Sequence, residues 1–265
     1  MTERSKRLGI TLNDSPPDST CVASKQCEAG FEDHRIRVGA QRRGKTRLRL
    51  LQCALAVFTE KGPDVAVIDD FIAAAGVSRG TFYNHFKTTH ELLLTLATAM
   101  SDEVLHIVDP LVLPLDEPVQ RFATGTRLYM QMAVRYPLWG SFITRVGTRI
   151  ATRGQLIDVY LTRDLELARM SGRIDVDSVL GARDLVLGSI FCGIETMLSE
   201  HTRAHHPEYL MRSVLIGLGL EPTEAQNIAF MPLPTPGAVE GPLFSTMRPV
   251  KRTSRQVLRQ SRPAN

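Results

Sequence analysis

The run Gly76-Val77-Ser78-Arg79-Gly80 matches the G-x-S-x-G pattern that places a nucleophilic serine on a sharp turn in hydrolases. Such a serine needs a buried strand before it, further strands around it, and an acid and a histidine later in the chain. The sequence offers almost no alternating β-branched runs and no repeating strand–helix units. A serine hydrolase built on Ser78 therefore stays a remote alternative. We predict no catalytic residue and expect that the protein is not an enzyme.

A second group of reactive side chains consists of His201, His205, His206 and Glu208, which are residue types that can bind a metal ion. The group lies at a predicted helix end beside Pro207, where histidines and polar side chains are common without any metal. Nothing in the sequence indicates that the four ligands would be arranged tetrahedrally. We therefore predict no metal site and no cofactor.

A third group of polar side chains follows Gly76 and suits contact with nucleic acid. Ser78 is a candidate N-cap, and Phe82 and Phe86 lie four residues apart, so they would share the buried face of a short helix. The opposite face would present hydrogen-bond donors and small side chains, which suit the floor of a DNA major groove. A helix over about 67–75, a turn at Gly76 and this short helix together form a helix-turn-helix.

Apolar residues recur at three- and four-residue intervals through most of the chain, which predicts helices and no sheet. The first helix would start at Thr46 as its N-cap and end at Lys61-Gly62-Pro63. The prediction is an all-α fold, with an N-terminal three-helix DNA-binding domain and a C-terminal helical domain. About nine helices are expected, at 46–60, 67–75, 78–86, 89–108, 118–136, 138–149, 155–170, 177–200 and 207–220.

The run VIDDFIAAAGVSRGTFYNHFKTTHELLL, from Val67 to Leu94, resembles the DNA-binding domain of TetR-family (tetracycline-repressor-like) transcription regulators, as does the preceding FTEKG. The resemblance implies that Thr81 and Tyr83 contact phosphates, and that Thr46 and Arg47 touch the DNA backbone from the first helix. It implies that Arg79, Gly80, Asn84 and His85 lie at or near base edges. The full predicted DNA-binding set is Thr46, Arg47, Ser78, Arg79, Gly80, Thr81, Tyr83, Asn84, His85 and Lys87.

The resemblance also implies a homodimer, in which helices 177–200 and 207–220 form a four-helix interface. Gly188 and Gly193 fit this interface. A glycine inside a helix destabilises the helix by roughly 1 kcal/mol relative to alanine, and the close approach of another helix would compensate for that cost. Two recognition helices about 34–36 Å apart would then meet a palindromic operator. A small-molecule effector is expected in the helical domain, with a pocket formed by Tyr129, Met132, Trp139, Phe142, Arg145, Phe191 and Glu195. Plain packing in the core explains each of these residues as well and stays an alternative.

The two ends of the chain differ from its middle in composition. Residues 11–34 and 231–265 lack an apolar period, and the latter segment carries six basic residues against one acidic residue. Seven Lys and Arg residues between Arg35 and Arg49, with no acid among them, suit either a DNA backbone or a solvated tail. We expect four segments, namely a disordered extension (1–40), the helix-turn-helix domain (41–88), the effector-binding and dimerisation domain (89–225) and a disordered basic tail (226–265).

These features together predict a ligand-responsive repressor that binds double-stranded operator DNA. An activator, or a regulator that needs no effector, would show the same sequence features and stays an alternative. No apolar run approaches the length of a membrane span, and no secretory signal is visible at the N-terminus. We therefore expect no membrane partner and a cytoplasmic location at the bacterial nucleoid.

Overall fold

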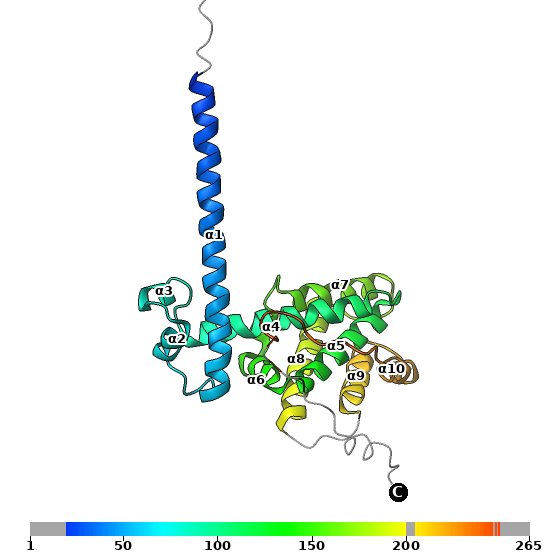
Figure 1. The fold of residues 1–265 in the computed structure, drawn as a ribbon. Coiled ribbons are helices and arrows are strands. Elements are labelled where there is room, and N and C mark those ends of the chain that lie inside the picture. The colour runs from blue at the N-terminus through cyan, green and yellow to red at the C-terminus, as the bar shows by residue number, and fades with distance from the viewer. Residues whose placement is uncertain (1–19, 200–204, 246, 248, 250–265) are drawn as a thin grey trace, which may run out of the picture. The chain divides into compact units, whose positions relative to one another are not determined.

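The structure, a computed structural model, describes residues 20–199, 205–245, 247 and 249, with side chains from residue 37 onward (Figure 1). Within these ranges the chain is helical and has no strand, which confirms the all-α prediction. None of the described helices is long and apolar enough to cross a membrane. The elements are α1 (Thr20–Lys61), α2 (Ile68–Ala75), α3 (Arg79–Tyr83), α4 (Thr89–Val112), α5 (Pro118–Arg135), α6 (Pro137–Val146), the 3-10 helix η1 (Gly147–Ala151), α7 (Leu156–Met170), α8 (Val179–Ser199), α9 (His206–Gly217) and α10 (Pro222–Ala229).

The chain divides into two units, Met1–Leu48 and Arg49–Asn265. In the first unit the structure corrects two predictions. Residues 20–40 are helical where disorder was expected, while 1–19 lie outside the described residues. Thr46 is not an N-cap, because its hydroxyl donates to the Arg42 carbonyl at 3.0 Å from inside α1. Arginine, lysine and glutamine are good helix formers, so the basic run continues the helix.

Four phenylalanines hold α2 and α3 against the end of α1. Phe58, Phe71, Phe82 and Phe86 are all buried. The ring centroids of Phe58 and Phe71 lie 5.0 Å apart, and those of Phe71 and Phe82 lie 6.3 Å apart. Such contacts add to the free energy gained by burying the rings, so a small domain of short helices can hold one geometry.

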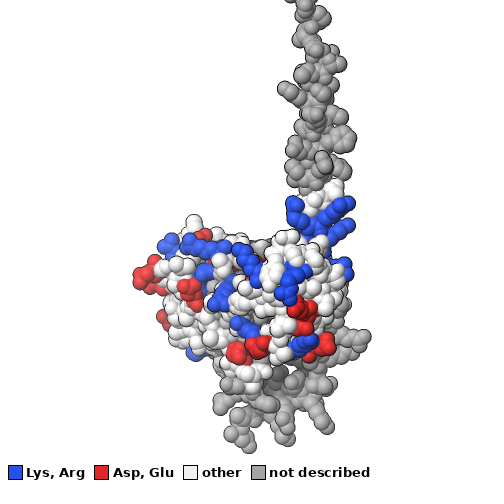
Figure 2. All heavy atoms as spheres, turned by 90° about the vertical axis from the view of Figure 1, so that its left-hand side faces the viewer, with Lys and Arg blue, Asp and Glu red and all other residues white. Residues whose placement is uncertain are grey.

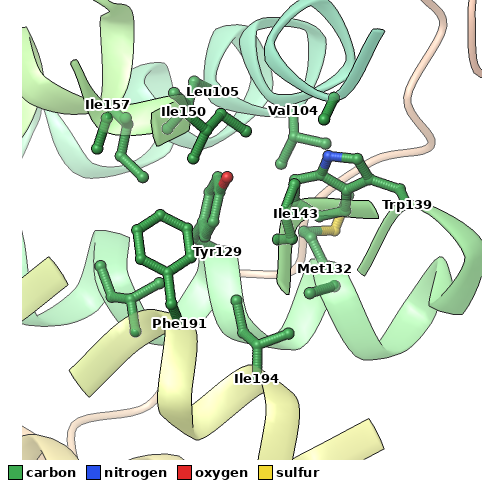
Figure 3. Close-up of a cluster of buried hydrophobic side chains, with 14 of the residues drawn as sticks. Val104, Leu105, Tyr129, Met132, Trp139, Ile143, Ile150, Ile157, Phe191 and Ile194 are labelled. Atoms are coloured by element: carbon green, nitrogen blue, oxygen red, sulfur yellow. The ribbon is translucent and has the colours of Figure 1, made fainter. Parts of the chain in front are cut away.

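The remaining helices form a bundle around α5. This helix packs against α4, α6, α7, α8, α9 and α10, while α4 runs from the end of the three-helix domain into the bundle (Figure 1). The bundle core combines aromatic side chains of α5, α6 and α8 with aliphatic ones, as Figure 3 shows for Tyr129, Trp139 and Phe191. The position of α4 is therefore set by the packing of the whole bundle.

The prediction of a disordered tail over 226–265 was wrong for its first part. The helix α10 extends to Ala229, and Val239, Leu243 and Phe244 are buried beyond it. Because these apolar residues follow no helical or strand period, the sequence pattern alone gave no sign of order. Residues 246, 248 and 250–265 lie outside the described part of the chain.

Candidate nucleic-acid interface and bundle cavity

The turn between α2 and α3 has the geometry that the sequence predicts. Gly76 ends α2 with φ +58°, a left-handed conformation that favours glycine. The Ser78 hydroxyl caps α3 by accepting the Thr81 backbone N–H at 3.1 Å, and it shares a 2.9 Å hydrogen bond with the Thr81 hydroxyl. A helix, not a strand, enters Gly76, and Ser78 serves as a cap. The hydrolase alternative was therefore wrong.

The helix α3 buries one face and leaves the other open. Phe82 is fully buried, whereas 46% of Tyr83 is exposed. Thr81 and His85 are half-buried, at the edge of the open face. The exposed members of the predicted DNA-binding set around this helix are Ser78, Arg79, Gly80, Tyr83, Asn84 and Lys87. The structure thus brings the predicted residues of 78–87 together on one polar surface.

Two acidic residues at the start of α2 were not among the predicted site residues. Asp69 forms an ion pair with Arg79, and both side chains are exposed. Asp70 pairs with the Lys61 ammonium at 2.6 Å and also accepts the Val67 N–H at 2.9 Å. These hydrogen bonds, first the one from Lys61, hold the pKa of the Asp70 carboxyl below its usual range. Asp69 therefore lies beside one predicted DNA contact, and Asp70 fixes the end of α1 to α2.

The predicted backbone contacts Thr46 and Arg47 belong to the helical part of the first unit. Arg47 is exposed and Thr46 is half-buried. The described side chains between Arg37 and Arg49 include six basic residues and no acid. Figure 2 shows Lys and Arg side chains gathered on the described part of this helix. The helix thus presents a concentrated positive charge.

The bundle contains a cavity of about 50 Å³ between α4, α5, α7 and α8, partly open to solvent. Its apolar walls include Leu105, Val108 and Val112 of α4. The polar residues that line it are Asp109, Arg121, Thr126, Tyr129, Tyr160 and Asp164. The Tyr129 hydroxyl shares a 2.7 Å hydrogen bond with the Ser101 hydroxyl, and burial raises the pKa of Tyr129 far above its usual value. A mostly apolar cavity with a few polar groups is typical of a small-molecule site.

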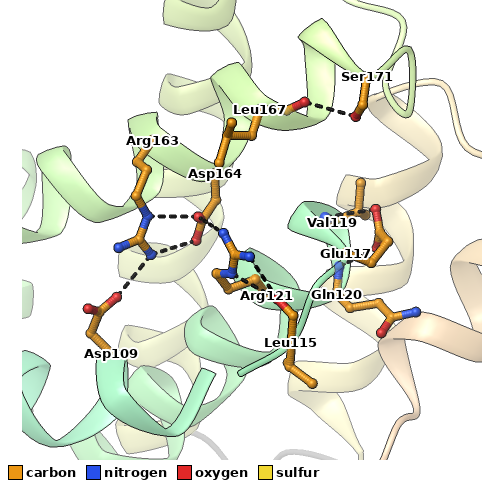
Figure 4. Close-up of polar contacts among 10 residues, drawn as sticks. All are labelled: Asp109, Leu115, Glu117, Val119, Gln120, Arg121, Arg163, Asp164, Leu167 and Ser171. Carbon is orange, nitrogen blue, oxygen red and sulfur yellow. Dashed lines mark hydrogen bonds and ion pairs between the residues drawn. The ribbon is translucent and has the colours of Figure 1, made fainter. Parts of the chain in front are cut away.

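Three of the cavity's polar lining residues, Asp109, Arg121 and Asp164, belong to a charged network (Figure 4). Arg163 contacts Asp109 at 2.9 Å and Asp164 at 2.9 Å, and Arg121 contacts Asp164 at 3.0 Å. The hydrogen bond to Asp164, together with the one to Asp109, raises the pKa of Arg163 above its usual value. The network therefore ties α4, α5 and α7 to one another. The sequence analysis missed it, although Asp109 stands on an apolar face of α4 between Leu105 and Val112, which is an unusual place for an acid.

The structure brings only one of the seven predicted pocket residues to the cavity. Tyr129 lines it, whereas Met132, Trp139, Phe142 and Phe191 are buried in the core away from its lining. Glu195 is exposed on α8. Arg145 forms an ion pair with Asp64, and the rings of Phe142 and Phe58 lie 5.8 Å apart. Two residues expected to bind an effector thus link α6 to the three-helix domain.

The histidine cluster near residue 205 shows no metal-like arrangement in the described part of the chain. Glu208 instead accepts a hydrogen bond from the buried Arg127 guanidinium at 3.1 Å. The described residues contain no group of three His, Cys, Asp or Glu side chains that could hold a metal ion, and His201 lies outside them.

Two protein-family models match the chain. The model of bacterial regulatory proteins of the TetR family matches residues 50–96, and the model of the tetracycline-repressor-like C-terminal domain matches residues 117–230. Together they cover more than half of the chain. The first contains the helix-turn-helix, and the second contains most of the bundle around the cavity.

Individual proteins similar to this chain include transcriptional regulators. The HTH-type transcriptional regulator YvdT of Bacillus subtilis (strain 168) is 41% identical over 49 residues, which are 18% of this chain and 25% of that protein. RolR, whose crystal structure in complex with resorcinol is known, has 28% sequence identity to this chain. The two structures match with a TM-score of 0.64 over 74% of this chain and 98% of RolR. A regulator from Shewanella sp. PV-4 shares the fold at 17% identity, with a TM-score of 0.53, over 66% of this chain and 99% of its own. The chain belongs to the TetR family of transcriptional regulators, which combine a DNA-binding helix-turn-helix with a ligand-binding helical domain.

Proposed function

We propose that the protein is a ligand-responsive repressor that binds a palindromic operator as a homodimer. It would act in the bacterial cytoplasm, at the nucleoid. The observation that carries the proposal is the exposed polar face of α3, which is fixed by the Gly76 turn and the Ser78 cap. A short helix of this kind enters the major groove, where Arg79, Asn84 and neighbouring side chains would meet base edges. Thr81, Tyr83 and Lys87 would contact phosphates, and Thr46 and Arg47 would touch the DNA backbone from α1.

The decisive experiment is a binding titration on the DNA that flanks the protein's own gene. At moderate salt the protein should form a complex with this fragment that survives a large excess of unrelated DNA, because base contacts discriminate between sequences. Equal affinity for both DNAs would contradict sequence-specific recognition. If transcription from the same DNA rises on adding the protein, the protein is an activator.

The basic part of α1 is expected to add phosphate contacts. Changing Arg42, Arg43 and Lys45 to glutamine should make the dependence of affinity on salt shallower. The negative slope of log affinity against log salt should shrink in magnitude by about 0.9 for each phosphate that is no longer neutralised. The measurement is DNA affinity at several salt concentrations. A control is Arg169→Gln, because Arg169 is exposed on α7. An unchanged slope in the triple variant would remove α1 from the DNA interface.

Exposed apolar side chains on α8 and α9 support the homodimer. Leu180, Leu185 and Tyr209 are exposed there, between 43% and 54%. Gly193 is explained within the chain, since a Cβ atom would lie 2.6 Å from the side chains of Met130 and Leu210. Gly188 is not, because a Cβ atom there meets nothing within 4 Å outside its own helix. A helix of a second copy approaching α8 closely would account for this glycine.

The dimer predicts an effect for a large side chain at position 188. Gly188→Arg should convert the protein to a monomer at micromolar concentration, because a bulky charge would stand between the two α8 helices. Sedimentation velocity measures the outcome. Gly44→Arg is the matched control, since Gly44 on α1 is also open, and it should leave the dimer intact. A dimer that persists in Gly188→Arg would assign the interface to another face.

The cavity is the proposed effector site. An apolar cavity that binds benzene has about 150 Å³. The cavity here measures about 50 Å³, so even a single-ring ligand must push its walls apart. Because α4 supplies one wall and continues from the DNA-binding domain, such a ligand would shift that domain. RolR, crystallised with resorcinol, suggests a small hydroxylated ring, whose hydroxyls Asp109, Arg121 and Asp164 could bind.

Resorcinol is therefore the first probe. At a hundred times its dissociation constant it should stabilise the protein by about 2.7 kcal/mol, seen as a higher melting temperature. Gly125→Ala should reduce this shift, because its methyl group would lie at the cavity wall, 3.8 Å from Val112. Gly181→Ala on α8 makes the same change with a similar contact, 3.8 Å from Ser178, away from the cavity, and should keep the shift. An equal shift in both variants would place resorcinol elsewhere.

A further inference from the structure

The segment from Met231 to Ser245, which we name the strap, follows the matched C-terminal domain and crosses the bundle. It has no regular secondary structure, yet Val239, Leu243 and Phe244 in it are buried at 6%, 2% and 2% exposure. Such burial within an irregular segment requires that its polar backbone groups find partners. These partners lie on helices α4, α5 and α1.

The first half of the strap is anchored to α5. Arg127 donates to the Met231 carbonyl at 2.9 Å, and Arg135 donates to the carbonyls of Pro236 and Gly237 at 3.0 and 3.1 Å. Two arginines two turns apart on one helix thus bind successive parts of the strap. Hydrogen bonds from charged donors are stronger than neutral ones, so this half follows α5.

Aromatic packing fixes the second half. The Phe244 ring packs edge-on against Tyr136, with centroids 4.9 Å apart, and lies 6.0 Å from the ring of Trp139. The Tyr136 hydroxyl also accepts the Val239 N–H at 3.4 Å. Trp139 is the only tryptophan in the chain, so its fluorescence reports on whether Phe244 is in place.

The turn at 241–244 then contacts α4. The Glu103 carboxylate accepts the backbone N–H of Leu243 at 3.1 Å and that of Phe244 at 3.3 Å. Gly241 lies so close to this carboxylate that a Cβ atom would overlap Oε2 of Glu103. A methyl group at position 241 would therefore displace the Glu103 carboxylate from the two N–H groups that it accepts.

The same turn reaches the DNA-binding domain. The Gln52 side chain on α1 donates to the Pro242 carbonyl at 3.3 Å. A strap anchored on α5 therefore contacts both α4 and α1 within one turn. Moving α4 against α5 would break the bonds to Glu103 or pull Phe244 away from Tyr136.

We propose that the strap is a clamp that holds α4 and α1 in the arrangement that binds DNA. Docking of the strap and binding of DNA then favour each other, because two events that stabilise the same arrangement are thermodynamically linked. The part of the proposal that concerns DNA rests on the proposed function. The part that concerns the coupling of the strap to α4 and α1 does not.

The test compares two glycines of the strap. Gly241→Ala places a methyl group against Glu103, whereas Gly237→Ala adds one where nothing lies within 4 Å. In the protein without DNA, Gly241→Ala should change the Trp139 emission and speed amide exchange of Leu243 and Phe244 about tenfold or more. Amide exchange should also rise in α4 near Glu103 and in α1 near Gln52. Gly237→Ala should match the wild type. Faster exchange confined to the strap would overturn the coupling.

Two further measurements sharpen the result. Glu103→Ala should cause the same exchange pattern, and adding Gly241→Ala to it should have little extra effect, because both changes break one contact. With the DNA that flanks the gene, Gly241→Ala should weaken binding about tenfold relative to Gly237→Ala. Equal DNA affinity of the two variants would overturn the clamp. If the wild type fails to bind that DNA, the proposed function fails, while the exchange data still decide the coupling.

Discussion

Changing Tyr83 and Asn84 together to alanine is expected to lower the affinity for the operator about a hundredfold or more. Both side chains are exposed, Tyr83 on α3 and Asn84 at its C-cap. Removing a good base contact, here the one proposed for Asn84, costs about 1–3 kcal/mol, and each 1.4 kcal/mol is a factor of ten in affinity. Loss of the phosphate contact proposed for Tyr83 adds to this cost. Affinity for unrelated DNA should fall far less, because the basic side chains that supply non-specific binding are unchanged.

A fluorescence-anisotropy titration of the operator fragment measures this effect, with circular dichroism as a check on folding. Val65→Ala is the control, since 69% of Val65 is exposed in the loop between α1 and α2, within the same domain. It should bind like the wild type. If the double variant retains wild-type affinity, α3 is not the helix that recognises the operator.

The second large effect is expected on stability, at the buried pair of Arg127 and Glu208. The Arg127 side chain is 3% exposed, and its guanidinium lies 3.1 Å from the Glu208 carboxylate. Arg127→Met would leave that carboxylate buried, with His205, at 3.9 Å, as its remaining ion-pair partner among the described residues. Removing one partner of a buried pair costs about 3–5 kcal/mol. The melting midpoint should therefore fall by roughly 6–20 °C.

The double variant Arg127→Met with Glu208→Leu is the matched test. Replacing both members of a buried pair by apolar residues is often close to neutral, so the double variant should recover most of the stability. The Arg127 Nε atom is buried without a hydrogen-bond partner among the described residues, so methionine loses no bond at that atom. The bond from Arg127 to the Met231 carbonyl is lost in both variants, so the recovery should fall short by about the worth of one hydrogen bond. Calorimetry measures the melting midpoint of both variants. If Arg127→Met alone melts at the wild-type temperature, the pair contributes little to stability.

Local sequence signals predicted the recognition element well. The Gly76 turn and the Ser78 cap depend only on neighbours three or four residues away, and the structure confirms both. Burial of Phe82 and Phe86 on one face likewise follows from their spacing. The start of α1 was misplaced at Thr46, because a threonine that can cap a helix can also hydrogen-bond from inside it.

The sequence by itself thus determined the all-α class, the order of the helices and the polar face of α3, because helix periods and caps are local. Only the tertiary structure decided which residues line the cavity, since this depends on how α4, α5, α7 and α8 cross. It also decided that Arg145 pairs with Asp64 and that residues 231–245 are ordered. These contacts join residues up to 190 positions apart, for which no short sequence pattern exists.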